Sequence, residues 1–209
     1  MTQFSFLRVF CTFFIITSFV VVAAIPLLHN QLYHALFKLN LDKNREQAER
    51  LATLVSIELE RGEDSAKVLS DVQNMLENTL QSSEHFACII EHENKVIAHP
   101  KPSNINKDTT GWTMNNGVEV KTFTQSAGEG VPFGGIQTRN DGSQDINYQI
   151  PISTKPWAVS VHTKLDIVDQ QATKILLQIG LIVLPSLLFI TVISALLVTR
   201  QKFKKSVSI

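Results

Sequence analysis

Six histidines have the widest chemical repertoire in this sequence, because imidazole serves both as a metal ligand and as a general base. They are His29, His34, His85, His92, His99 and His162. None of them forms HExxH or pairs with a carboxylate at zinc-ligand spacing. His92 and His99 are seven residues apart on two predicted hairpin arms, where a surface or turn position is the simpler interpretation. The sequence therefore predicts no metal site.

Motifs of nucleophilic catalysis and phosphate binding are absent as well. There is no GxSxG, no Walker loop and no GxGxxG, and the glycines at 128–130 and 134–135 suit bends at strand ends. All 19 acids but only 14 of the 19 bases lie in residues 29–174, so that this block carries a net charge of −5 and disfavours nucleic acid. We expect neither an enzyme nor a cofactor, and a hydrolase with an unrecognised site ranks last.

The five bases outside residues 29–174 lie next to two apolar stretches, although the chain as a whole is neutral. Residues 9–28 and 175–199 contain no Asp, Glu, Lys, Arg or His. Helices over Val9–Leu28 and Ile175–Val198 are long enough to cross the roughly 30 Å hydrocarbon core of a bilayer, and Pro185 predicts a kink in the second. Two buried core helices are the alternative, but two such runs at opposite ends of one small soluble domain are uncommon.

The bases beside these stretches predict the orientation. Arg8 precedes the first stretch, Arg200 and three lysines follow the second, and basic flanks mark the cytoplasmic side. We therefore expect a cytoplasmic N-terminus (1–8), a first span (9–28), a block outside the bacterial inner membrane (29–174), a second span (175–198) and a short basic cytoplasmic tail (199–209). A cleavable signal peptide is the alternative for the first span, but its apolar run extends through Leu28, longer than a usual signal core.

The outer block combines helices with a sheet. Residues 29–61 lack Gly and Pro and predict a long helix that ends at Gly62, and residues 63–80 predict a second, amphipathic helix. Strands are expected at 85–91, 95–99, 118–125, 132–139, 145–152 and 157–163, with a long loop over 100–117 and a helix from Leu165. Cys88 lies in an apolar stretch and is expected to be buried. The fold class is α+β, with a long N-terminal helix and five or six antiparallel strands.

Two stretches of this block resemble a known family. FACIIEHENKVIAHP is followed by a loop with TTGW, and YQIPISTKPWAVSV precedes the exit helix. Together with the flanking spans, this order resembles the single Cache domain, a PAS-like extracytoplasmic sensor of bacterial chemoreceptors, histidine kinases and diguanylate cyclases. The resemblance covers residues 29–174. It departs from the family after Val198, where only eleven residues remain and no output domain can fit. Either the chain is a piece of a longer receptor or it signals through a partner.

The resemblance implies a small-molecule pocket between the sheet and the long loop. Carried over by position, its candidate residues are His99, Trp112, Phe133, Arg139 and Tyr148. The aromatic rings would form apolar walls, and Arg139 would hold a carboxylate through two hydrogen bonds. Each has a structural alternative: Trp112 as a plug on the sheet, Arg139 as a solvated strand end, and His99 with Pro100 as a turn. Phe86 and Trp157 are expected in the core.

The resulting functional hypothesis is a membrane-anchored, extracytoplasmic small-molecule sensor that relays ligand binding through its spans to a separate signalling partner. We also expect a homodimer or a membrane signalling partner, because residues 41–61 form an amphipathic arm. The alternative is that the apolar face of this arm packs on the sheet of its own domain. The alternative is a ligand-independent adaptor that uses the Cache-like domain as a docking surface.

Overall fold

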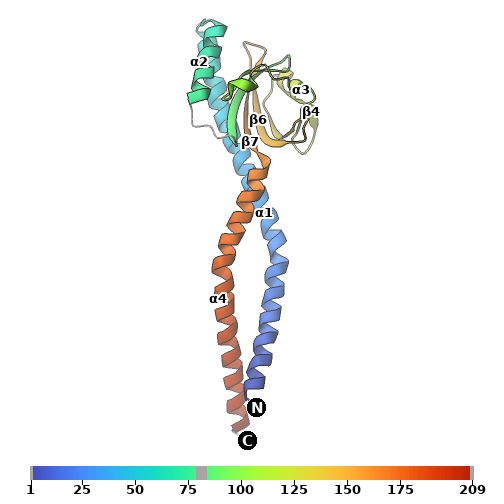
Figure 1. Cartoon of the computed structure of the whole chain (residues 1–209), viewed down its shortest axis with the longest axis vertical. Helices are drawn as coiled ribbons and strands as arrows, with labels where there is room; N and C mark the ends of the chain where they lie inside the picture. The colour runs from blue at the N-terminus through green and yellow to red at the C-terminus, as the bar shows by residue number, and fades with distance from the viewer. Residues whose placement is uncertain (1, 79–83, 208–209) are drawn as a thin grey trace. The chain divides into compact units, whose positions relative to one another are not determined.

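The computed structural model describes residues 2–78 and 84–207, and the chain divides into two units. The first unit comprises the described parts of Met1–His34 and Gln170–Ile209, and the second is Ala35–Asp169. Two long helices, α1 (Thr2–Glu60) and α4 (Leu165–Val207), contribute residues to both units. Figure 1 shows the helices and strands of each unit.

The first unit consists of two helical segments that are long and apolar enough to span a membrane. None of the most apolar window of α1 is buried and only 11% of that of α4 is, so neither segment is the core helix of a soluble domain. Pro26 and Pro185 both lie within continuous helix. The exposed apolar side chains of both segments are consistent with a membrane-embedded chain.

The second unit contains a seven-stranded antiparallel sheet. The spatial order is β2-β1-β7-β6-β5-β3-β4. The strands are β1 (His85–Glu91), β2 (Lys95–Ala98), β3 (Thr113–Asn115), β4 (Val120–Thr122), β5 (Phe133–Thr138), β6 (Gln144–Ile152) and β7 (Trp157–Lys164). The sheet has one strand more than expected, because three-residue β3 lies inside the predicted loop.

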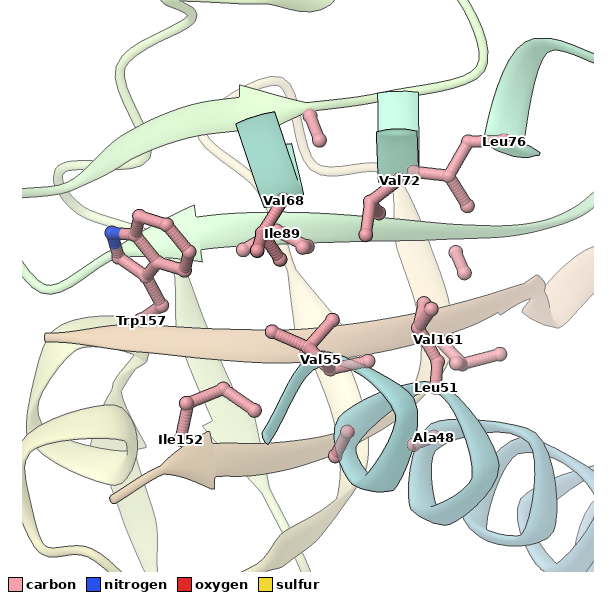
Figure 2. Close-up of a cluster of buried hydrophobic side chains, with 14 residues drawn as sticks. Ala48, Leu51, Val55, Val68, Val72, Leu76, Ile89, Ile152, Trp157 and Val161 are labelled. Carbon is pink, nitrogen blue, oxygen red and sulfur yellow. The ribbon is translucent and has the colours of Figure 1, made fainter. Parts of the chain in front are cut away.

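One face of the sheet packs against α1 and α2 (Ser65–Asn78), as Figure 2 shows. The helices present apolar side chains at helical spacing, and β1, β6 and β7 present alternate residues toward them. The resulting core includes Ala48, Leu51, Val55, Val68, Val72, Leu76, Ile89, Ile152, Trp157 and Val161. Trp157 lies in the core as expected. The second helix was expected over 63–80, of which residues 79–80 lie outside the described residues.

The expected strand over 118–125 is wrong in its second half. Only Val120–Thr122 is extended, and α3 (Phe123–Gly128) begins immediately afterwards. Thr122 Oγ1 accepts a hydrogen bond from Gln125 N at 3.2 Å, and Gln125 Oε1 accepts one from Thr122 N at 2.9 Å. This reciprocal capping box satisfies two helix N-terminal donors and overrides the strand-like alternation.

The face of the sheet that carries Cys88 also carries a second apolar cluster. Its members are Cys88, Ile90, Val96, Trp112, Met114, Phe123 and Phe133. On β5, β6 and β7 the same face is polar, because Gln137, Asn147, Ser160 and His162 are all buried there and joined through Asn147. A buried polar layer therefore adjoins the apolar cluster.

Candidate functional site

A cavity of about 290 Å³ lies in the second unit. It is bounded by the end of α2, strands β1 and β7, the segment that follows β2, and the end of β5. Its lining residues are Leu76, Glu77, Phe86, Cys88, Val96, His99, Pro100, Lys101, Asn104, Lys107, Trp112, Arg139, His162 and Lys164. The lining combines aromatic rings, imidazoles and four basic side chains with one acid.

Strand alternation brings the side chains of β1 and β7 to this cavity. Phe86 pairs across the ladder with His162, and the two rings stack with centroids 4.8 Å apart and planes inclined by 14°. Cys88 and Lys164 each lie two residues from one of these positions and therefore share their face. Phe86 was expected in the core, but it is half-buried and forms a wall of the cavity.

His99 is the first residue after β2 and begins the segment that borders the cavity. Its ring centroid is 5.0 Å from that of Phe86, and its Nδ1 accepts a hydrogen bond from Lys101 N at 2.9 Å. Burial lowers the pKa of His99 to about 4, and the nearby His162 and Arg139 add to this effect. At neutral pH the ring is therefore uncharged, and its Nδ1 is held as an acceptor.

A charged network forms the floor beside the cavity. Arg139 pairs with the buried Asp145, whose Oδ2 lies 3.5 Å from His162 Nδ1. Burial raises the pKa of Asp145, but the hydrogen bond to His162 and the charges of His162 and Arg139 outweigh it and bring the pKa below its usual value. For His162 burial has the opposite effect: it lowers the pKa of the imidazole, although the hydrogen bond and the charge of Asp145 act in the other direction. Asp145 is thus an ionised carboxylate whose charge is already balanced.

Cys88 and His162 add a nucleophile and a base to this network. Cys88 Sγ lies 3.3 Å from His162 Nε2. Burial raises the pKa of the Cys88 thiol to about 12, and the side chain is 2% exposed. The thiol is buried as expected and protonated at neutral pH, which makes it a weak nucleophile.

The structure brings three of the five predicted binding residues to the cavity. His99, Trp112 and Arg139 line it, with the Arg139 guanidinium 5.2 Å from the Trp112 ring centroid. Arg139 is not a solvated strand end, because it pairs with Asp145. Trp112 also belongs to the second apolar cluster, so it plugs the sheet and lines the cavity.

Phe133 and Tyr148 lie elsewhere. Phe133 is buried in the second apolar cluster beneath Lys121, whose Nζ is 5.1 Å from the ring centroid, and it does not line this cavity. Tyr148 packs against the core on the helix-covered face, next to Gly134. Adjacent residues of a strand point to opposite faces of the sheet. Because Asn147 faces the polar layer, its neighbour Tyr148 points to the other face, away from the cavity.

The sequence reasoning missed most of the charged lining. Lys101, Lys107 and Lys164 line the cavity, as does Asn104. The alternation in WAVSVHTK offered a usable signal, because His162 and Lys164 must share a face once β7 is a strand. No local pattern marks Lys101 or Lys107, which irregular backbone brings to the site. Among residues 2–78 and 84–207, no group of three or more His, Cys, Asp or Glu side chains is placed to hold a metal ion.

Comparison with known proteins gives no match to a family model and no significant match to a curated protein. Solved structures are similar. The periplasmic sensor domain of a chemotaxis protein is 18% identical over 61% of this chain and 96% of its own, with a TM-score of 0.43. A Cache chemosensory domain, described in a structural study of carboxylic acid recognition, is 12% identical over 63% of this chain and 97% of its own, also with a TM-score of 0.43.

The chain spans only 38% of a third similar structure, the extracellular domain of a protein assigned as the histidine kinase mmHK1S-Z2. There the identity is 14% over 48% of this chain, and the TM-score is 0.37. Two of these three structures are thus described as sensor or chemosensory domains, and the third is described as an extracellular domain.

Proposed function

We propose that this chain is a membrane-anchored sensor whose extracytoplasmic domain, residues 29–174, binds a small molecule and relays binding through two spans to a separate partner. The observation that carries this proposal is the cavity of about 290 Å³ with aromatic and basic lining. Ligand pockets in proteins combine apolar walls with a few converging polar groups, and Phe86, Trp112 and Arg139 provide that combination.

The membrane orientation in this proposal rests on the basic residues at the two ends of the chain. Arg8 flanks the first candidate span, and Arg200 with Lys202, Lys204 and Lys205 flanks the second. Both ends would be cytoplasmic by the positive-inside rule, and the cavity-bearing unit would face the periplasm or the cell exterior.

Two direct connections from the cavity support a relay. Leu76 of α2 lines the cavity and also packs in the core that α2 shares with α1. Lys164 lines the cavity as the last residue of β7, and α4 begins at Leu165. A ligand that shifts α2 would therefore act on α1, and one that shifts β7 would act on α4. Each of these two helices contains a candidate span.

The test is a thermal-shift screen of the full chain in nanodiscs against a library of small metabolites. We expect at least one compound to raise Tm, because a ligand that binds only the folded state stabilises it. Asn104→Trp, which fills the cavity, should abolish the shift, while Asn74→Trp at an exposed position of α2 should preserve it. A screen without hits, or hits insensitive to Asn104→Trp, would overturn the proposal.

A further inference from the structure

Hydrogen bonds between α1 and the sheet gather around one buried amide. Asn44 is a fully buried polar residue on the face of α1 that otherwise packs apolar side chains against the sheet. Its Nδ2 donates to the carbonyl of Ile146 at 2.8 Å, and its Oδ1 accepts a hydrogen bond from Thr163 Oγ1 at 2.9 Å. Because Ile146 of β6 pairs with Thr163 of β7, this one amide binds two adjacent strands.

The network continues along the same row of the sheet to β1. Thr163 also pairs with His85, whose Nδ1 lies 2.8 Å from Thr163 Oγ1 and whose Nε2 lies 2.6 Å from Gln47 Oε1. A carbonyl oxygen can only accept, so the amide of Asn44 has one possible orientation, and the Thr163 hydroxyl must donate to it. Asn44 and Gln47, three residues apart on one helix face, therefore attach α1 to three strands.

The apolar residues of α1 do not by themselves define the position of the helix along the sheet. Those in the core are Ala48, Leu51, Ala52, Val55 and Leu59. If α1 moved toward its N-terminus by four residues, roughly 6 Å along its axis, the places of Ala48, Leu51 and Val55 would receive alanine, valine and leucine, respectively. The place of Ala52 would receive the small Ser56. The core volume is nearly conserved, so the apolar packing accommodates a second register.

The polar row of the sheet distinguishes the two registers. In the second register Ala48 would lie in the place of Asn44, and Leu51 would lie in that of Gln47. The Thr163 hydroxyl and the Nε2 of His85 would then face aliphatic side chains and lose their hydrogen-bond partners on α1. Buried polar groups without partners are costly, so these bonds favour the observed register.

We infer that Asn44, Gln47, His85 and Thr163 form a register lock, which holds α1 in one of two positions that the apolar core accommodates. This inference goes beyond the proposed sensor function and depends on no ligand. A buried Asn fixes the register of helices in coiled coils, and one-turn shifts of a helix past its neighbour occur in switching proteins. Nothing lies within 4 Å of a Cβ on Gly62 in the connection to α2, which leaves room for the end of α1 to move.

Spin-label distances on the full chain in nanodiscs test the lock. Labels at Asp42→Cys and Ser153→Cys, both exposed, are introduced in a Cys11→Ser/Cys88→Ala background. The distance between them follows the position of α1 along β6, because Asn44 contacts Ile146 near the start of this strand and Val55 packs near Ile152 at its end (Figure 2). We expect one narrow distance distribution for the chain with an intact lock.

The double variant Asn44→Ala/Gln47→Leu removes the distinction between the registers. An alanine and a leucine then occupy the two places in either register, so the polar row no longer favours one of them. We expect a second population, longer by up to about 6 Å. Ala52→Ser is the matched control, because it likewise places the same residue at one position in both registers but leaves the lock intact, and it should keep the single distance.

Thr163→Val tests the lock from the side of the sheet. It removes the hydroxyl that binds Asn44 and nearly conserves the side-chain volume, so it should also populate the longer distance, to a smaller extent. This variant decides the question if the double variant does not fold. A single distance identical to that of the intact lock in Thr163→Val and in any folded double variant would overturn the inference. An equal second population in Ala52→Ser would overturn it as well, because the register would then not depend on the polar row.

Discussion

Gln73 of α2 and His99 of the cavity wall are joined by two hydrogen bonds through one side-chain amide. Gln73 Nε2 donates to the carbonyl of His99, and the backbone N–H of His99 donates to Gln73 Oε1, each at 2.9 Å. A side chain thereby continues the hydrogen bonding of the sheet edge just beyond β2 and ties a helix to the cavity.

This relationship predicts that Gln73→Leu destabilises the domain. The substitution leaves two backbone groups of His99 unpaired, which costs about 1–3 kcal/mol each where water cannot replace the bond. Urea denaturation of the full chain in nanodiscs measures the loss, and Asn74→Leu at the exposed neighbouring position is the control. Equal stability of the two variants would show that the pair contributes nothing.

The buried imidazoles predict a loss of stability on acidification. The pKa of His99 falls from 6.5 to about 4 on folding, and burial also lowers the pKa values of His85 and His162. Between pH 6.5 and pH 4 the unfolded chain binds more protons than the folded chain does. The free energy of unfolding therefore decreases as the pH falls through this range. His99→Gln should flatten this slope. An unchanged slope would exclude His99 as its source.

Close packing at Gly134 predicts a large effect of a single methyl group. A Cβ at this position would overlap the ring of Tyr148 and lie 3.2 Å from Leu41 Cδ1. Gly134→Ala should therefore lower the free energy of unfolding by about 1–3 kcal/mol, as overpacking does in other cores. Gly128→Ala is the matched control, because nothing lies within 4 Å of a Cβ there. Similar stabilities of the two variants would mean that Tyr148 moves aside freely.

The Cys88 thiol should resist alkylation in the folded domain. Burial raises its pKa to about 12, so the reactive thiolate is scarce, and the side chain is 2% exposed. In a Cys11→Ser background, iodoacetamide at pH 7.5 should label Cys88 at least a hundredfold more slowly without urea than with it. Mass spectrometry follows the modification. Rapid labelling of the folded chain would show that the cavity opens to Cys88.

Much of the fold is predictable because several elements have clear local signals. The strand His85–Glu91 has the predicted bounds. The helix predicted to end at Gly62 stops at Glu60, two residues before Gly62, whose φ is 84°. The strand predicted over 118–125 is wrong from Phe123 onward, because the decisive interaction there is a side-chain capping box and not hydrophobic periodicity.

The site was less predictable than the fold. Family position suggested His99, Trp112 and Arg139, which line the cavity, but it also suggested Tyr148, whose strand register directs it to the other face. The register of a strand depends on its pairing with distant segments. A shift of one residue in this pairing moves every side chain of the strand to the opposite face of the sheet. Lys101 and Lys107 lie in irregular backbone, for which no period exists to predict a direction.

The junction at Lys164 and Leu165 has a mechanical consequence. Lys164 ends a strand that borders the cavity, and Leu165 begins a helix. No loop residue lies between them that could absorb a displacement. Hydrogen-bonded strands and helices both resist extension along their axes. A displacement of the end of β7 would therefore be passed to the beginning of α4. In the proposed sensor, a flexible glycine–serine insert between these two residues is therefore expected to preserve ligand binding and to abolish its transmission toward the second candidate span.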